Sequence, residues 1–250
     1  MIAVIVPIYN TEKYLRETID SVICQTLSFA EHIRLILLDD ASTDGSFAIC
    51  EQYQKQYPKQ IVVKHYDTNQ GVSALRNEGV RIAGEMGDEL ITFLDSDDKL
   101  ADDAVEKAVQ YFDAHEDVFV AAIGIRYFDA YEGEQRLNWR FEKTDVVDIK
   151  KDYTYPHYYV GGVFLRHAVL DELHFDESLS FWEDALAVNQ VIVSQGKYGL
   201  IAGTHYYYRK REDESSLVDT AWHKKERYTT LLSSGYGQLF AYSRKKHHRI

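Results

Sequence analysis

Short apolar runs alternate with amphipathic stretches through the first half of the chain. The runs have the length and composition of buried strands and are residues 3–6, 33–38, 61–66, 90–94 and 118–125. The stretches between them carry apolar residues at helical spacing and are residues 12–23, 46–57, 72–86 and 102–115. Pro7 is expected to end the first strand, and Thr11 to cap the first helix. This alternation predicts βαβ units and a mostly parallel sheet.

The second half is less regular. Residues 126–139 are expected to form short strands or a hairpin around Glu132 and Gly133. Helices are predicted at 181–195 and 221–249, and a tyrosine-rich strand at 205–209. We therefore expect one domain over residues 1–220, divided near residue 125, and a helical extension over residues 221–250 that could lead to a further domain.

Composition narrows the class of protein. The chain has 250 residues, of which 45% are hydrophobic, and this suits one well-packed domain. Its formal net charge of -12 argues against a nucleic-acid binder. Cys24 and Cys50 fall in predicted helices, where we expect small buried hydrophobes, as in a reducing cytoplasm.

The two ends of the sequence carry information about where in the cell the protein is expected. The first residues lack the charged segment of a secretory signal, and no run of about eighteen apolar residues exists. A cytoplasmic protein is therefore expected. The basic residues 244–249 are read as a solvated helix end, as the start of a longer chain, or as a contact with anionic lipid at the inner face of a membrane.

The most informative residues are Asp95, Ser96, Asp97 and Asp98, directly after the apolar run 90–94. Carboxylates two residues apart at a strand end can reach one point beyond the sheet, where open α/β sheets bind ligands. Hard cations such as Mg²⁺ or Mn²⁺ prefer oxygen ligands and pair with substrate phosphates. The motif thus predicts a metal–diphosphate site, and the alternative is an acidic turn that caps the next helix.

Further motifs stand in order along the chain. They are residues 6–10 (VPIYN), 39–45 (DDASTDG), 69–77 (NQGVSALRN), 95–98 (DSDD), 182–184 (WED) and 207–211 (YYRKR). Together they closely resemble the family-2 glycosyltransferases of GT-A fold that build bacterial cell-surface polysaccharide or teichoic acid. The resemblance implies an α/β, Rossmann-like fold with a mostly parallel central sheet flanked by helices. It also implies a nucleotide-sugar-binding half (1–125) and an acceptor-binding half (126–220).

The resemblance implies a role for individual residues on the donor side. The residues expected to contact the nucleotide sugar are Pro7, Tyr9, Asn10, Asp40, Asn69, Gly71, Arg76, Asp95, Ser96, Arg209 and Arg211. Asp40 would accept a hydrogen bond from the uracil N–H, since a carboxylate only accepts. Arg76, one turn inside a helix, would hold a phosphate or brace the site carboxylates.

The remaining implied residues hold the metal and perform the chemistry. Asp97 would bind the cation, with His205 as a further ligand, although His205 could equally be an ordinary strand residue. Many members carry a histidine where this chain has Arg211, so a cationic phosphate contact is expected there instead. Asp184 is implied as general base, with Glu183 orienting it or contacting the acceptor. The alternative for this pair is two carboxylates favoured by a helix N-terminus.

The implied reaction is an inverting, metal-dependent transfer from a nucleotide-diphosphate sugar, expected to be a UDP-sugar, to a glycan or lipid-linked acceptor hydroxyl. A non-catalytic GT-A module that binds nucleotide or glycan is the alternative. An NAD-dependent Rossmann enzyme is disfavoured because the first strand leads into VPIYN and not a G-x-G-x-x-G turn. The identity of the donor and acceptor sugars and the oligomeric state stay open.

Overall fold

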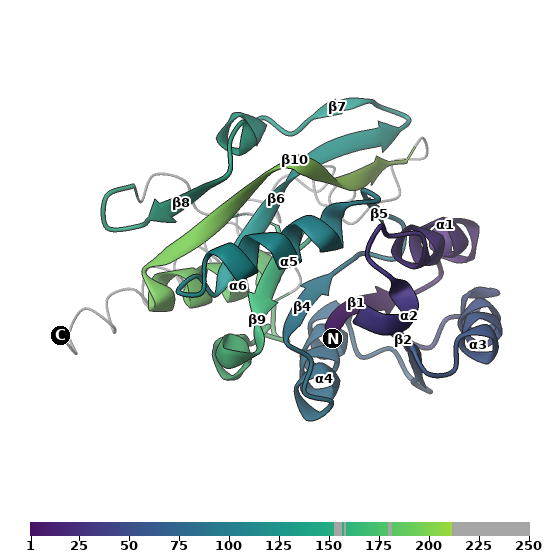
Figure 1. Ribbon diagram of the computed structural model, residues 1–250. Coiled ribbons are helices and arrows are strands. Elements are labelled where there is room, and N and C mark those ends of the chain that lie inside the picture. The colour runs from purple at the N-terminus through teal and green to yellow at the C-terminus, as the bar shows by residue number, and fades with distance from the viewer. Residues whose placement is uncertain (153–156, 158, 180–181, 212–250) are drawn as a thin grey trace, which may run out of the picture.

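The computed structural model describes residues 1–152, 157, 159–179 and 182–211. One twisted sheet forms its centre (Figure 1). The strands are β1 (Ile2–Ile8), β2 (Ile33–Asp39), β3 (Ile61–His65), β4 (Leu90–Phe93), β5 (Lys99–Leu100), β6 (Val120–Asp129), β7 (Gly133–Glu134), β8 (Asp145–Asp148), β9 (Val163–Arg166) and β10 (Lys197–Lys210). The helices are α1 (Glu12–Ile23), α2 (Phe29–His32), α3 (Ser46–Gln56), α4 (Val72–Glu85), α5 (Ala104–Ala114) and α6 (Glu183–Gln195), with 3-10 turns η1 (Asn138–Phe141) and η2 (His167–Glu172).

The strand order is β3-β2-β1-β4-β9-β6-β10-β5, with β7 paired to β6 and β8 to β10. Strands β3, β2, β1 and β4 run parallel, as the alternation predicts. Strand β9 is antiparallel to both β4 and β6, so it joins the parallel block to the second half. The α/β fold with a mostly parallel sheet is therefore confirmed.

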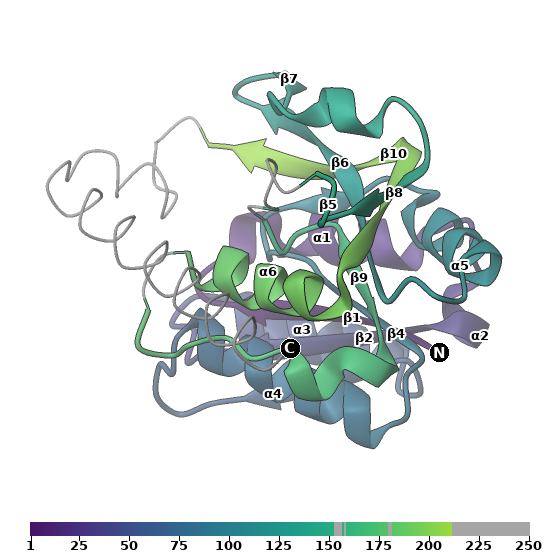
Figure 2. The ribbon, with the colours of Figure 1, turned by 90° about the vertical axis from the view of Figure 1, so that its left-hand side faces the viewer.

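Helices cover both faces of the sheet because successive strand residues point to opposite faces. Val4 and Val6 of β1 pack in a core with α1, α3 and α5, whereas Ala3 and Ile5 pack in a second core with α4 and α6. Figure 2 shows α4 and α6 together on one side of the sheet. No helix in the part of the chain described here is both long and apolar enough to cross a bilayer.

Strand β1 continues through Pro7, contrary to the prediction that Pro7 ends it. The carbonyl of Ile5 accepts from Leu94 of the β4 side, whereas that of Ile8 accepts from Asp40 of the β2 side. Backbone groups of Pro7 therefore face the β4 side, where pairing with β1 has already ended at Ile5. No ladder hydrogen bond is lost there, so proline is tolerated.

Two other local predictions are corrected. Thr11 stands at the N-cap of α1, but its side chain makes no capping bond; instead, its backbone N–H donates to Ser46 Oγ at 2.9 Å. Cys50 is buried as predicted, whereas Cys24 is exposed at the end of α1, and both are free thiols.

In the second half of the chain, the observed elements agree only in part with the predicted ones. β6 and β7 form the expected hairpin, with Tyr127 opposite Gly133. The predicted strand 205–209 is the end of a longer strand, β10, whose pairing with β6 shifts register between Ile201 and His205. The helix predicted over residues 221–249 lies outside the described residues, as do residues 180–181.

Candidate active site

The carboxyl ends of the parallel strands bring several predicted residues to one edge of the sheet. Asn10 follows β1, Asp40 follows β2, Gly71 follows β3 and Asp95 follows β4. The backbone N–H of Asn10 donates to Ser42 Oγ at 3.0 Å, and its Oδ1 accepts from the N–H of Thr43 at 2.8 Å. The loops after β1 and β2 therefore support each other at this edge.

Asp40 organises the loop that enters α4. Its two carboxylate oxygens accept from the backbone N–H groups of Gln70, at 2.6 Å, and Gly71, at 2.9 Å. Asn69 Nδ2 donates to the Asp40 carbonyl at 3.4 Å. Gly71 has φ of 90°, which favours glycine, and the space that a Cβ would fill is open. Tyr9 is 51% exposed beside this edge, and the contact of Asp40 with a uracil N–H stays a prediction.

A buried tyrosine of β10 holds the Asp95–Asp98 loop through two hydrogen bonds. Tyr206 of β10 donates its hydroxyl to Asp98 Oδ2 at 2.7 Å and accepts from the Asp95 N–H at 3.1 Å. The carbonyl of buried Ser96 accepts from Thr18 of α1 at 3.0 Å. The ring of Tyr206 lies against Gly161, where a Cβ would stand 2.6 Å from it. Asp98 is therefore a structural residue, and its burial raises its pKa well above the usual range.

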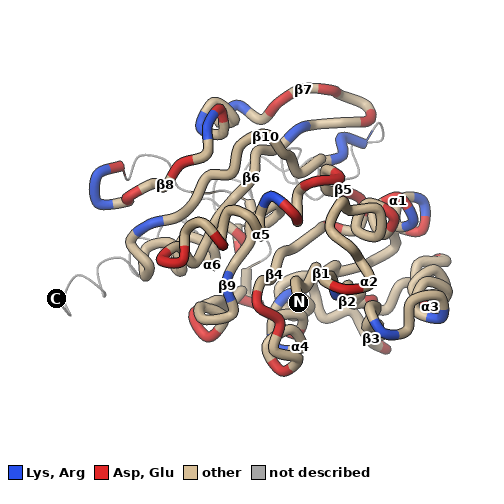
Figure 3. The backbone as a smooth tube through the Cα atoms, viewed as in Figure 1, with Lys and Arg blue, Asp and Glu red and all other residues tan. Residues whose placement is uncertain are grey.

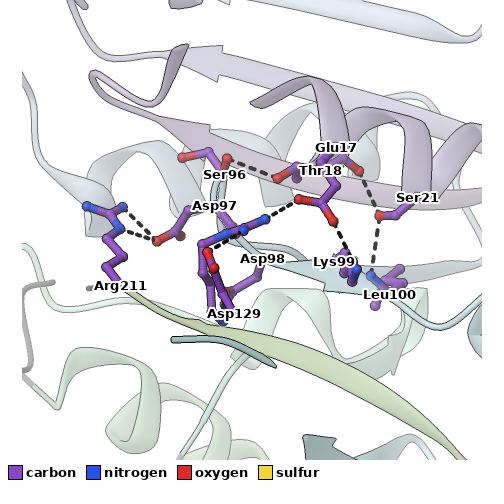
Figure 4. A network of polar contacts seen from close by, with 11 residues as sticks. Glu17, Thr18, Ser21, Ser96, Asp97, Asp98, Lys99, Leu100, Asp129 and Arg211 are labelled. Atoms are coloured by element: carbon purple, nitrogen blue, oxygen red, sulfur yellow. Dashed lines mark hydrogen bonds and ion pairs between the residues drawn. The ribbon is translucent and has the colours of Figure 1, made fainter. Parts of the chain in front are cut away.

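Arg209 fixes the same loop through a group we call the Arg209 cluster, which consists of Arg209, Glu17, Asp129 and the Asp97 carbonyl. Figure 4 labels Glu17, Asp97 and Asp129 of this cluster. Arg209 Nε donates to the Asp97 carbonyl at 2.6 Å and its Nη1 to Asp129 at 2.8 Å, and its Nη2 donates to Glu17. Its backbone N–H donates to Asp98 at 2.7 Å. Each of the three guanidinium nitrogens thus donates to a protein acceptor, which gives Arg209 a positioning role, and its predicted contact with the diphosphate stays a prediction.

Arg211 lies just beyond β10, whose end is basic (blue in Figure 3). Its Nε and Nη2 donate to the same oxygen, Asp97 Oδ2, at 2.9 and 2.6 Å. Burial raises the pKa of Asp97, Arg211 acts in the opposite direction, and Asp95 adds to the rise.

The residues present fit a divalent cation held jointly with a substrate. Within the described ranges, no group of three or more histidine, cysteine or acidic side chains could hold a metal ion by itself. Mg²⁺ and Mn²⁺ sites that use one or two carboxylates and complete their shell with phosphates and water need no such cage. Asp97 supplies one such carboxylate, and the Nε and Nη2 bonds from Arg211 both end at its Oδ2.

His205 is not brought to this group. Its backbone carbonyl accepts from the N–H of Ala101 at 3.0 Å, and the charged groups that act on its ring are Arg126, Glu134, Asp103 and Lys107. Burial, with the charge of Arg126, lowers the pKa of His205. None of these charged groups belongs to the Asp95–Asp98 loop, and the metal-ligand role of His205 stays a prediction.

Arg76 joins the Asp95 loop to the start of α6. Its Nη2 donates to Asp95 Oδ1 at 3.1 Å, and its Nη1 donates to Glu183 Oε1 at 2.9 Å. The side chain is 5% exposed and packs against Phe175, with its guanidinium carbon 5.6 Å from the ring centroid. Of the two roles open for Arg76, the structure shows the bracing of site carboxylates. We call Arg76, Asp95, Glu183 and Asp184 the Arg76 cluster.

Asp184 is an acid of this cluster with a raised pKa. Burial and the charge of Glu183 raise its pKa to about 7, while Arg76 acts in the opposite direction. Its Oδ1 accepts from the N–H of Ala185 at 2.6 Å, as expected at the start of a helix. A carboxyl with a pKa near neutrality can take up a proton at physiological pH, as a general base must.

Sequence reasoning missed the residues that support the site from other elements. Tyr206, Glu17 and Asp129 carry no motif of their own, because their roles arise from sheet pairing. Asp129 has φ of 79°, a left-handed conformation that is uncommon for residues other than glycine. The one sequence signal was the tyrosine-rich strand predicted over residues 205–209, which did not indicate the hydroxyl contact.

Known proteins resemble this chain in sequence and in fold. The family model described as glycosyl transferase family 2 matches residues 3–174. The chain belongs to this family. In Bacillus subtilis (strain 168), the minor teichoic acid biosynthesis protein GgaA is 43% identical over 249 residues, which are 99% of this chain and 55% of that protein. GgaB of the same organism is 40% identical over 88% of this chain and 24% of its own length.

A solved structure of S. aureus TarS 1-349 in complex with UDP-GlcNAc superimposes with a TM-score of 0.74. It is 26% identical in sequence and covers 84% of this chain, which spans 59% of that structure. The fold is therefore that of the GT-A glycosyltransferases. The chain spans only about half of GgaA and a quarter of GgaB.

Proposed function

We propose that this chain is an inverting glycosyltransferase that moves a sugar from a UDP-sugar to an acceptor hydroxyl of a bacterial cell-surface glycan, such as teichoic acid. The observation that carries the proposal is the bridge made by Arg76. One buried guanidinium contacts both Asp95 of the Asp-Ser-Asp motif and Glu183 beside Asp184. The residues expected at the donor diphosphate and those expected at the acceptor hydroxyl are thus parts of a single cluster.

Asp184 is proposed as the general base. It takes the proton of the acceptor hydroxyl as the oxygen attacks the anomeric carbon, and the bond from that carbon to the diphosphate breaks on the opposite face. A pKa of about 7 suits this task, because the group is both ionised and basic enough near neutral pH. Glu183 and Arg76 set the basicity of this carboxylate through their opposing charges.

Asp97 is the residue proposed to hold Mg²⁺ or Mn²⁺. When bound, such a cation would neutralise the charge that develops on the departing diphosphate. Arg76 and Arg209 keep the Asp95–Asp98 loop in place for this purpose through their contacts with Asp95 and the Asp97 carbonyl.

The choice of donor and acceptor is supported by the relatives. TarS was solved with UDP-GlcNAc, and GgaA and GgaB are described as acting in minor teichoic acid biosynthesis. Exposed Tyr9 beside the Asp40 loop offers a surface on which a base could stack. Contact with a membrane surface through residues 244–249 remains a prediction from the sequence.

The proposal is tested with the 250-residue chain, a panel of UDP-sugars and a teichoic acid polymer as acceptor. We expect sugar transfer with one UDP-sugar, loss of transfer with EDTA, and inverted anomeric configuration by NMR. A parallel thermal-shift series compares UDP, CDP and GDP, because a ligand that binds the folded state raises apparent stability.

The outcomes separate the possibilities. A shift with GDP or CDP and none with UDP would overturn the base assignment. Binding of UDP with no transfer to any acceptor would favour a non-catalytic GT-A module. Retention of configuration would contradict the single displacement with Asp184 as base.

A further inference from the structure

The contact between Arg211 and Asp97 involves the carboxylate to which the proposed function assigns the cation. Both side chains are 18% exposed, and two nitrogens of Arg211 converge on one oxygen of Asp97. The guanidinium carbon also lies 5.1 Å from the ring centroid of Tyr14. A largely desolvated, doubly hydrogen-bonded and ring-stacked pair is an ordered contact, unlike a solvated surface ion pair.

Arg209 provides a comparison two residues earlier in the chain. It meets two carboxylates and a backbone carbonyl from three separate segments, and these contacts fix its position. Arg211 directs two of its guanidinium nitrogens to the single oxygen Asp97 Oδ2. A change in the charge or in the ligands of Asp97 therefore acts directly on Arg211.

A divalent cation and a guanidinium are both attracted to the same carboxylate, and each would weaken the binding of the other. A nucleoside diphosphate that arrives with the cation brings negative charge of its own. It can therefore supply a new partner for an arginine displaced from Asp97, since guanidinium pairs well with phosphate oxygens.

We propose that Arg211 is an internal counter-ion, which occupies Asp97 in the donor-free protein and moves to the donor diphosphate when cation and donor bind together. This inference rests on the proposed function, because it takes Asp97 as the cation ligand. It makes Arg211 a positioning residue that couples the two ligands. The Arg211–Asp97 pair has to be broken only once for the two ligands together. Each ligand therefore favours binding of the other, so cation and nucleotide bind with positive cooperativity.

The test measures Mn²⁺ binding to the nucleotide-free protein by electron paramagnetic resonance, and UDP binding with and without Mn²⁺ by calorimetry. In Arg211→Gln, we expect Mn²⁺ alone to bind about tenfold more tightly, because its competitor is gone. The same substitution should weaken UDP binding in the presence of Mn²⁺ and reduce the cooperativity between them. Opposite changes in the two affinities are expected only if one arginine serves both positions.

Arg126→Gln is the matched control, because Arg126 forms an exposed pair with Glu134 on the β6–β7 hairpin. It removes the same charge and should change neither affinity. Arg211→Lys keeps the charge but loses the paired geometry, so it should fall between wild type and Arg211→Gln. It also provides the measurement if the glutamine variant does not fold.

Unchanged or weaker Mn²⁺ binding by Arg211→Gln or Arg211→Lys would overturn the exchange. Asp97→Asn tests the assumption that Asp97 holds the cation. It should abolish Mn²⁺ binding both in the wild-type protein and in Arg211→Gln. Persistent Mn²⁺ binding by Asp97→Asn would reject the cation site itself, and with it the metal part of the proposed function. Tighter Mn²⁺ binding together with weaker UDP binding, in a protein that transfers no sugar, would support the exchange. That result would contradict only the catalytic part of the proposed function.

Discussion

Two clusters, each built around a buried arginine, differ in the balance of their charges. In the Arg209 cluster, one cation meets two carboxylates that also lie partly in solvent, and Lys99 adds a second cation to Glu17. In the Arg76 cluster, one cation faces three acids, Asp95, Glu183 and Asp184, in a more buried setting. The first cluster is balanced and the second is not.

This difference in charge balance changes the pKa of an acid in each cluster. Burial works against ionisation of Glu17, but hydrogen bonds from Lys99 and Arg209 outweigh it and lower the pKa of Glu17. Burial and Glu183 together raise the pKa of Asp184 to about 7, and Arg76 only partly offsets them. A cluster with balanced charges keeps its carboxylates ionised and can hold a loop in place. A cluster with excess negative charge raises the pKa of a carboxylate, which is the property that the proposed general base requires.

The comparison predicts its largest effect at Asp184. Replacing Asp184 by Ala should reduce the transfer rate by about a thousandfold, because general-base catalysis is typically of this order. Donor affinity should stay near that of the wild type. Initial rates with the donor identified by thermal shift, together with calorimetric UDP titration, measure both quantities.

Asp113→Ala is the control for this change, since Asp113 is an exposed acid on α5. Near-normal turnover by Asp184→Ala would reject Asp184 as the base.

The Arg209 cluster should respond in stability. Arg209→Met should lower the free energy of unfolding by about 2 kcal/mol, because it leaves the Asp97 carbonyl and two carboxylates without their shared partner. The partly exposed carboxylates can recover some hydration, which keeps the loss below that of a fully buried pair. Urea unfolding measures the change, and Lys143→Met, at an exposed pair with Asp145, serves as the matched control. Equal stability of the two variants would show that the cluster does not hold the loop.

A pH profile tests the charge imbalance directly. The transfer rate should fall as pH decreases through about 7, since Asp184 must be ionised to accept a proton. Glu183→Gln removes the neighbouring negative charge that raises the pKa of Asp184, and its amide oxygen can still accept from Arg76. The midpoint should therefore move to lower pH by about one unit. A midpoint that stays in place or rises would mean that Asp184 is not the titrating group.

The smallest effect is expected at Tyr206. Tyr206→Phe deletes the hydroxyl that links Asp98 to the Asp95 N–H while it preserves the ring against Gly161. We expect a loss of about 1 kcal/mol in unfolding free energy, the usual contribution of a hydrogen bond. Tyr131→Phe, on an exposed ring, is the control for urea unfolding. A larger loss in Mn²⁺–UDP affinity than in stability would show that the hydroxyl also shapes the loop.

Prediction from the sequence succeeded where local pattern is sufficient. The strands of the parallel block, and the loops at their carboxyl ends, follow from apolar runs and helical spacing. The pattern alone places Asp95 beyond the end of a strand, and the structure shows Asp40 and Gly71 at the ends of β2 and β3 on the same edge. It failed for Pro7, because tolerance of a proline in a strand depends on whether the neighbouring strand continues beside it.

The amino-acid sequence by itself determined which side chains stand at the strand ends and at the start of α6. Tertiary structure alone decided how they are paired: Arg76 meets Glu183 across 107 positions, and Arg209 meets the Asp97 carbonyl across 112. It also directed Arg211 to Asp97 and placed His205 near the charges of Arg126 and Glu134. The physical reason is that strand periodicity fixes the face of each residue only once the register of β10 against β6 is set, and that register is a property of the folded sheet.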